Sequence, residues 1–539
     1  MKNRLGLRTV LPAAFLAAIL ILTLAFACTS ATASAENSVL ATEDSSLTFG
    51  QVSDIHYFPA EHCYSADAAD YEDSDFYHST TGDTKLVIES GAVGTAHIEA
   101  FIEDARKGEA PVYLLATGDL SKNGEHAALI DVANGLRYLQ NQVRALGGKY
   151  ANFQVLVSQG NHDLYNGSGK LYDPDDGSEY QAEVVTSAQF ALIFAGLGYP
   201  DMTYETLCDI YPAEYWSSSA TNAFAPDTDG YVESANADNL TFTYYNENLA
   251  GLANGFNYGD YTELYSGENI NALSYYVEID DSDFAFFVLD GTDRELTEDV
   301  VPVRISEAEY NLISEDVKAF YLGTEDGKIA TEAASPEDVL AALANDEPVY
   351  ADTGYNHITG GRLKEDLLEW MRGLTAANPD RTYIGAYHFN ILPHFEQEDD
   401  ILKDFVFYNW EYIAKSFLEM GIRYGLSGHM HASDVAYYTD AAGRTFYDIE
   451  TGSIVSYGSP RRYMSVTRYD LADGKVGEKF TSSLRVLDSF DGMNDDGDYE
   501  NYNDYITENL YGQLVERIVD HFITCLLYTS PSPRDPKTS

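Results

Sequence analysis

Five short apolar runs in this chain each end in a polar cluster whose side chains can bind a metal. The runs are bounded by Gly or polar residues, which is typical of buried strands. They are Leu47–Ser53, Val112–Thr117, Gln154–Ser158, Thr382–Tyr387 and Tyr424–Ser427. Helical patterns at Thr95–Lys107 and His126–Leu146 separate the first three runs. Strands that alternate with helices predict an α/β fold whose sheet is parallel at least in part.

The polar clusters are expected to meet at one edge of this sheet, although they are far apart in the sequence. Sheets of this kind bind ligands outside the carboxyl ends of their strands. The candidate ligands are Asp54, His56, Asp119, Asn161, His388, His429 and His431. For any one of them, a role as a loop residue or helix N-cap is the better explanation. Together, in this order, they favour two transition-metal ions held side by side.

The ordered motifs Asp-x-His, Gly-Asp, Gly-Asn-His-Asp, His and Gly-His-x-His resemble the calcineurin-like metallophosphoesterase superfamily over roughly Leu47–Tyr469. The string Thr117–Glu125 is similar to a secreted bacterial branch that contains cyclic-nucleotide phosphodiesterases. The resemblance implies a four-layer α/β/β/α sandwich with cap insertions. It also implies hydrolysis of a phosphoester by a hydroxide that bridges two metal ions.

The resemblance assigns a role to each candidate ligand. Its assignments are Asp54, His56 and His431 for the first ion, Asn161, His388 and His429 for the second, and Asp119 as the bridge between them. The cofactors would be two divalent transition-metal ions, Mn, Fe or Zn, because imidazole suits these metals. The fourth motif has one His where relatives commonly have two in a row. His394 is therefore an alternative to His388, although the strand-end position favours His388.

His162 is not expected to be a ligand but to face the leaving-group oxygen as a general acid or hydrogen-bond donor. Some relatives orient this His with an Asp three residues after the bridging Asp. Lys122 occupies that position here, and Asp163 is the alternative orienting residue.

Two arginines, Arg461 and Arg462, follow the last motif. Relatives often carry a similar Pro-x-Arg stretch beside the active site, and a guanidinium fork suits a phosphate oxygen. The alternative is a surface turn in a hairpin that runs from Ala436 to Arg468. The sequence leaves both interpretations open.

The two ends of the chain carry signals of their own. Basic residues, the apolar run Val10–Ala27 and the small residues Ala33-Ser34-Ala35 predict a signal peptide at 1–35, hence a secreted or cell-surface protein. Lipoprotein processing at Cys28 is the less favoured alternative. No later stretch reaches the ~18 apolar residues that cross a bilayer. Residues 525–539 resemble a translated sequencing adapter, so we expect them to be foreign to the natural chain.

The remaining chain is expected to form one metallophosphoesterase domain at 36–480, then an acidic linker and a helix at 481–524. Cap insertions are expected at about 164–271 and 291–360, with a third after the first motif. Helices are expected at Gly361–Leu374 and Asp404–Gly421. Cys63 and Cys208 lie in insertions, and an oxidising compartment favours a disulfide between them. Two free thiols are the alternative.

The net charge of −55, from 87 acidic and 32 basic residues, limits the partners. Such a chain repels polyanions, so stable binding of a nucleic-acid polymer is not expected. A small phosphorylated substrate, such as a nucleotide or another phosphodiester, fits the resemblance. The preference for a diester rests on analogy. The alternatives are a phosphomonoesterase and a non-catalytic extracellular binding protein with a structural metal site.

Overall fold

The computed structural model describes residues 42–80, 84–218, 224, 230–264, 271–296, 300–303, 321–325, 328–333, 349–352, 355–402, 405–471, 476–493 and 499–510. The expected signal peptide, the adapter-like residues and the last part of the expected C-terminal helix lie outside these ranges. No helix in the described ranges has the length and hydropathy needed to cross a membrane. The chain divides into a small unit, 1–44 with 468–477, and a large unit, 45–467 with 478–539. The site lies in the large unit.

The first sheet contains the strands that carry three of the five motifs. Its order is β20-β19-β1-β2-β3, and β1 pairs with β2 and β2 with β3 in parallel. The bounds are β1 Thr42–Val52, β2 Tyr113–Thr117, β3 Gln154–Ser158, β19 Pro460–Asp470 and β20 Val476–Val486. All residues of β2 and β3 are buried, as their apolar sequences predict.

The second sheet carries the other two motifs. Its order is β17-β18-β16-β15-β8-β7-β6. The four strands from β18 to β8 run parallel, and the flanking strands pair antiparallel. The bounds are β6 Leu240–Tyr244, β7 Tyr275–Ile279, β8 Phe284–Val288, β15 Thr382–Ala386, β16 Ile422–Ser427, β17 Asp434–Thr439 and β18 Thr445–Glu450.

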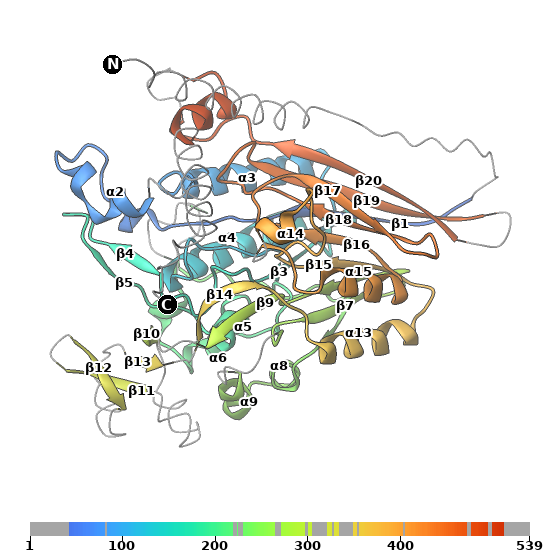
Figure 1. Cartoon of the computed structure of the whole chain (residues 1–539), viewed down its shortest axis with the longest axis horizontal. Coiled ribbons are helices and arrows are strands. Elements are labelled where there is room, and N and C mark those ends of the chain that lie inside the picture. The colour runs from blue at the N-terminus through green and yellow to red at the C-terminus, as the bar shows by residue number, and fades with distance from the viewer. Residues whose placement is uncertain are drawn as a thin grey trace, which may run out of the picture. The chain divides into compact units, whose positions relative to one another are not determined.

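The two sheets pack face to face, with helices on their outer faces (Figure 1). The ring of Phe286 in β8 lies 5.8 Å from Phe49 in β1, edge to face. On the opposite face of the first sheet, Leu114 of β2 packs against α3 (Ser90–Arg106) and α4 (His126–Ala145). The next residue in β8, Phe287, joins a separate apolar cluster with α13 (Glu365–Ala377) and α15 (Trp410–Glu419). The period-2 alternation of strands thus builds four layers, and the predicted sandwich is confirmed.

The insertion after the first motif packs with part of the long insertion after the third. The short helices η1 (Ala60–His62), η2 (Tyr71–Asp73) and α2 (Asp75–Thr80) precede α3. Phe76 of α2 and Tyr172 of the β4–β5 hairpin (Lys170–Tyr172, Glu179–Gln181) share a small apolar cluster with Phe58. These two segments form one satellite core.

The rest of the expected 164–271 cap belongs largely to the main body. The elements are α5 Ser187–Ile193, α6 Tyr204–Cys208, α7 Ala213–Trp216, β6, α8 Glu247–Ala253 and α9 Tyr258–Glu263. Phe190 and Trp216 lie in the main core, and β6 is an edge strand of the second sheet. The tyrosines Tyr199, Tyr211 and Tyr261 are fully buried and belong to the main core.

The second insertion, which lies between β8 and α13 in the sequence, forms small antiparallel sheets (Figure 1). One sheet pairs β14 with β9, and the other has the order β10-β13-β11-β12. The bounds are β9 Thr292–Leu296, β10 Val300–Val303, β11 Tyr321–Glu325, β12 Lys328–Ala333, β13 Val349–Asp352 and β14 Tyr355–Gly361.

Several expected boundaries differ from the structure. Helix α13 begins at Glu365 because Gly361 ends β14. Helix α15 begins at Trp410, after Asn409 with φ of 57°. The stretch 436–468 is not one hairpin, because β18 joins the second sheet and β19 the first. Two further short helices are η3 (Gly148–Tyr150) and α14 (Glu398–Ile401).

Residues 481–493 and 499–510 do not form a solvated linker. Strand β20 extends to Val486, and residues 502–510 are helical. The side chains buried against the main core are Leu487, Phe490, Met493, Tyr502, Ile506 and Leu510. This segment therefore extends the domain beyond the expected boundary at residue 480.

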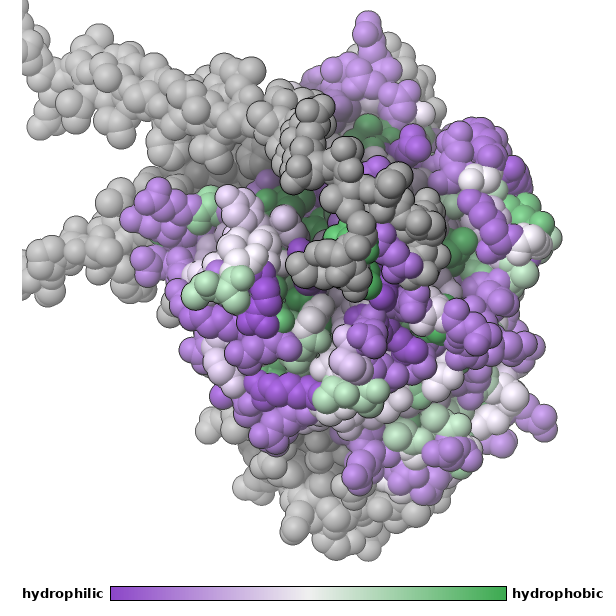
Figure 2. All heavy atoms as spheres, turned by 90° about the vertical axis from the view of Figure 1, so that its right-hand side faces the viewer, coloured by the Kyte–Doolittle hydropathy of each residue, from purple (hydrophilic) through white to green (hydrophobic). Residues whose placement is uncertain are grey.

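The expected disulfide is wrong, because Cys63 and Cys208 are both free thiols. Cys63 packs beside the satellite core and Cys208 beside the main core, so the two side chains lie in different apolar clusters. On the face shown in Figure 2, hydrophilic side chains predominate and apolar ones form separate small patches, in keeping with the acidic composition.

Candidate metal centre

The backbone at the strand ends is unusual. Five of the seven candidate ligands have positive φ, in the left-handed region that non-glycine residues rarely adopt. They are Asp54 at 53°, His56 at 44°, Asp119 at 50°, His429 at 72° and His431 at 57°. Such conformations cost free energy and cluster at functional sites, where the surrounding structure enforces them. The strand ends are therefore shaped to turn these side chains toward one point.

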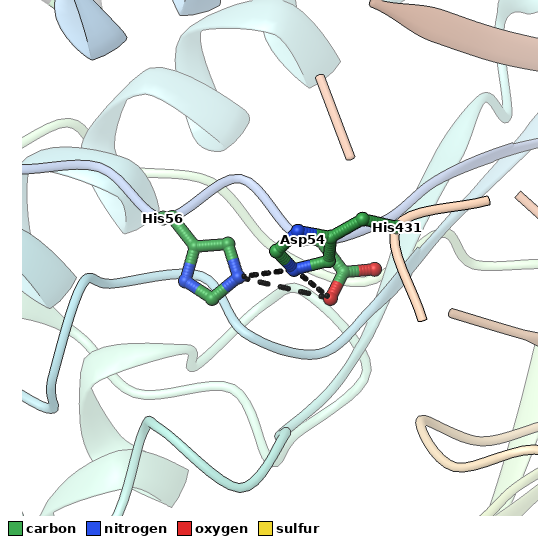
Figure 3. A group of neighbouring side chains, drawn as sticks. All are labelled: Asp54, His56 and His431. Atoms are coloured by element: carbon green, nitrogen blue, oxygen red, sulfur yellow. Dashed lines mark hydrogen bonds and ion pairs between the residues drawn. The ribbon is translucent and has the colours of Figure 1, made fainter. Parts of the chain in front are cut away.

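The first cluster comprises Asp54, His56 and His431 (Figure 3). The Nε2 atoms of His56 and His431 lie 3.0 Å apart. Oδ1 of Asp54 is 3.4 Å from His431 Nε2 and 3.8 Å from His56 Nε2. Two ring nitrogens and a carboxylate oxygen thus converge from the loops after β1 and β16. Zn, Fe and Mn all accept donors of these types.

The second cluster surrounds Nε2 of His388. Oδ1 of Asn161 lies 2.9 Å from this atom, and Nδ1 of His429 lies 3.2 Å from it. Oδ2 of Asp119 is 3.2 Å away. These donors come from the ends of β2, β3, β15 and β16, so both sheets contribute to this cluster.

Asp119 connects the two clusters. Its Oδ2 lies 3.2 Å from His388 Nε2 and 3.5 Å from His56 Nε2. Its other oxygen accepts the backbone N–H of His162 at 2.9 Å. The side chain is buried between the two donor sets, which is the place that a bridging carboxylate requires.

Hydrogen bonds behind the clusters orient the ligand rings. Nδ1 of His388 lies 2.9 Å from the Thr117 carbonyl, which can only accept, so Nδ1 carries the proton and Nε2 is left to bind. The His429 N–H donates to the Asp54 carboxylate at 3.0 Å and ties the two sheets together. Nδ1 of His56 has an unusual neighbour, the Lys85 ammonium, at 3.3 Å.

Burial and charge set the protonation of the site. Burial lowers the pKa of His56 and His429 well below the usual value, and Lys85 lowers that of His56 further. Burial opposes a charge on His388, but Asp119 outweighs it and raises the His388 pKa to about 9. Burial likewise opposes the Asp119 charge, yet His388 and His162 hold the Asp119 pKa well below its usual range. The site therefore presents neutral imidazoles at His56 and His429 beside the anionic Asp119 carboxylate, a donor set that suits dications.

The His162 side chain is 27% exposed, whereas those of Asp119 and His56 are buried. Its Nε2 is 3.8 Å from Asp119 Oδ2. Its Nδ1 lies 2.6 Å from the Lys122 carbonyl and 2.9 Å from the Asn123 side-chain amide. His162 also forms a third His/Asp group with His56 and Asp119. Its partial exposure suits a group that meets substrate.

Asp163 does not orient His162. Its Oδ1 accepts the N–H groups of Leu120 and Ser121, and its Oδ2 accepts that of Gly160 at 2.8 Å. Burial and the nearby Asp119 raise the Asp163 pKa to about 6. The Asp163 side chain therefore connects the loops after β2 and β3 by hydrogen bonds.

His394 is not placed with the candidate ligands. Its Nδ1 lies 3.4 Å from Asp434 Oδ2 and 3.6 Å from Glu450 Oε2. The structure thus brings His388, and not His394, into the second cluster.

Both arginines are buried and bound to protein groups. Arg461 donates to Asp104 at 2.8 Å. Arg462 donates to the Thr451 hydroxyl at 2.9 Å and to the Glu450 carbonyl at 2.6 Å. These contacts favour a structural role over a phosphate contact. Their burial also argues against a surface turn.

Sequence reasoning missed Lys85, Asn123 and two rings beside His429. Phe389 and Phe405 lie 4.3 and 4.7 Å from the His429 ring, centroid to centroid. Only Asn123 had a sequence signal, because it follows the position where relatives carry an orienting Asp. Phe389 directly follows His388 of the fourth motif, whereas Lys85 and Phe405 come from segments without a motif.

The donor set fits two transition-metal ions. Around each cluster the donors are imidazole nitrogens with carboxylate or amide oxygens, and Asp119 belongs to both. Gly428 also suits this site, because the Cβ of any other residue at this position would lie only 2.5 Å from Asp54 Oδ2. Ions placed here would act as Lewis acids and lower the pKa of bound water.

Comparison with known proteins agrees with this geometry. The family model described as Calcineurin-like phosphoesterase matches residues 47–322, just over half of the chain. The match contains Asp54, His56, Asp119 and Asn161 and ends before the last three candidate ligands. The search of curated proteins found no match.

Proposed function

Because the chain belongs to the calcineurin-like phosphoesterase family, we propose that it is an exported two-metal hydrolase of a small phosphodiester. The family and the clustered ligands support a metal-dependent phosphoesterase in general. The observation that carries the proposal is the position of Asp119. Its Oδ2 faces ring nitrogens of both clusters within 3.5 Å, so one carboxylate can serve two ions.

The residues of the chain have separable roles in this reaction. Asp54, His56 and His431 would hold one ion, and Asn161, His388 and His429 the other. Bound there, Mn, Fe or Zn would supply Lewis-acid activation of a water and charge compensation for the phosphoryl oxygens. His162 donates a hydrogen bond or proton from Nε2 to the leaving-group oxygen, since Nδ1 is held by the Lys122–Asn123 loop.

A diester substrate is supported by the Thr117–Glu125 string, and the two arginines do not favour a monoester instead. A phosphomonoester carries up to two negative charges and gains from an additional cation beside the metals. Arg461 and Arg462 do not supply that cation, because their guanidinium groups are bound to Asp104 and to groups of β18 and the loop after it. A diester, with one negative charge, requires less compensation.

The test uses the chain without residues 1–35, stripped of metal with a chelator. Bis-(p-nitrophenyl) phosphate and p-nitrophenyl phosphate are assayed in parallel with Mn, Zn, Fe or no metal. The expected result is metal-dependent cleavage that is faster on the diester. Cleavage of the monoester alone would reassign the protein as a phosphatase. No cleavage of either ester by the metal-bound protein would favour the binding-protein alternative.

Export is tested separately. The chain from residue 1, expressed in a secreting bacterial host, is expected outside the cytoplasm with residue 36 at its N-terminus. Retention of residues 1–35 on a cytoplasmic protein would contradict this part of the proposal.

A further inference from the structure

In some relatives an aspartate orients the His that corresponds to His162, and this chain has Lys122 at that position. Asp163, the alternative, is fully engaged with backbone N–H groups of two loops. The ring of His162 is nevertheless held at Nδ1. Its neighbours there are the Lys122 carbonyl at 2.6 Å and the Asn123 side-chain amide at 2.9 Å.

The two neighbours of Nδ1 are complementary. The carbonyl can only accept, so it binds the ring when Nδ1 carries a proton. The Asn123 amide can present either end. With its nitrogen toward the ring it donates to an unprotonated Nδ1, and its oxygen then accepts from Lys122 Nζ at 3.2 Å. The ring therefore keeps a partner at Nδ1 whether its proton is on Nδ1 or on Nε2.

Asn123 is itself held in place. Its backbone N–H donates to the buried Glu125 carboxylate at 2.8 Å, and the N–H of Gly124 donates to the Ser121 hydroxyl at 2.8 Å. Gly124 has φ of 76°, and a Cβ there would meet the His162 carbonyl oxygen at 2.9 Å. The loop is thus tightly fitted against the residue that it orients.

We propose that Asn123 is the positioning residue of His162, in the place of the aspartate of relatives. The proposal rests on the proposed function, in which His162 protonates the leaving group. Asn123 keeps the ring directed at the leaving-group oxygen by its contact with Nδ1. It does not itself touch the substrate.

The test compares two diesters that differ only in leaving group, methyl p-nitrophenyl phosphate and methyl phenyl phosphate. The phenolate leaves less readily and depends more on the acid. In Asn123→Ala, kcat is expected to fall about 10-fold on the phenyl ester and less than about 3-fold on the nitrophenyl ester, as part of the ~10²–10⁴-fold value of a positioned acid. KM and metal content should match the parent.

Asn166→Ala is the matched control. Asn166 also contacts His162, but through the His162 carbonyl at 3.2 Å rather than the ring. This variant is expected to change both esters equally. Asn123→Asp, which can still accept from Nδ1, is expected to restore the parental preference between the two esters.

A double mutant separates positioning from folding. In a His162→Ala background, Asn123→Ala is expected to cause no further loss on the phenyl ester. An equal loss on both esters, or additive losses, would overturn the proposal. A crystal structure of Asn123→Ala adds a readout independent of activity, because the His162 ring should lose its single orientation. An unchanged ring would overturn the positioning role even in a protein inactive on diesters, whereas inactivity alone would count against the proposed function.

Discussion

We expect the buried His97 to make the folded protein less stable in acid, and its replacement should remove part of that pH dependence. His97 lies on α3, 6% exposed, with Nε2 2.8 Å from the Ser459 hydroxyl. Its Nδ1 has no hydrogen-bond partner among the described residues. Arg461 lines the same cavity of about 30 Å³. Burial and the Arg461 charge lower the His97 pKa from 6.5 to about 3.

The direction and magnitude of this change in the free energy of unfolding follow from proton linkage. The unfolded chain binds a proton at this His below about pH 6.5, whereas the folded chain does so only near pH 3. Stability contributed by the neutral ring is therefore present at high pH and is lost as pH falls through that window. Each pH unit within it costs about 1.4 kcal/mol. Between about pH 7 and pH 5 the loss amounts to roughly 2 kcal/mol.

The variant is His97→Gln, which retains a hydrogen-bonding group for Ser459. Urea unfolding of the metal-free protein gives its stability and that of the parent at both pH values. His78→Gln, at an exposed histidine of α2, is the control. The stability gap between parent and His97→Gln should shrink by about 2 kcal/mol on going to pH 5. The stability difference between parent and His78→Gln should not change with pH. The same result for His97→Gln would refute the reasoning.

Three further predictions concern the metal centre. Asp119→Asn keeps the shape of the bridge but removes its charge, so diester turnover should fall at least ~100-fold with the circular-dichroism spectrum unchanged; retained turnover would exclude Asp119 from the centre. His388→Ala should lose about one of two bound ions by elemental analysis, whereas His394→Ala, whose ring contacts Asp434 and Glu450, should keep both. Equal losses in the two variants would contradict the ligand assignment. His162→Ala should bind both ions yet slow turnover, most for the phenyl ester, and unchanged kinetics would remove His162 from the mechanism.

The positions of the seven candidate ligands were predictable because each depends on local sequence. An apolar run makes a strand, a polar cluster marks its end, and parallel strands bring their carboxyl ends to one edge. His388 was preferred over His394 on this ground alone, and the structure places it accordingly. The predicted C-terminal helix is likewise present in the described residues 502–510.

Tertiary structure alone decided which polar groups meet. Arg461, Arg462 and Asp163 all carry charges suited to the site, but each is used by backbone or side chains brought in from elsewhere. Cys63 and Cys208 remain apart because different apolar clusters hold them. A strand pattern is local, whereas the partner of a buried polar group depends on every element packed around it. The sequence by itself determined the chemistry available at the sheet edge, and the packing of loops from distant segments determined that Asn123 lies against His162.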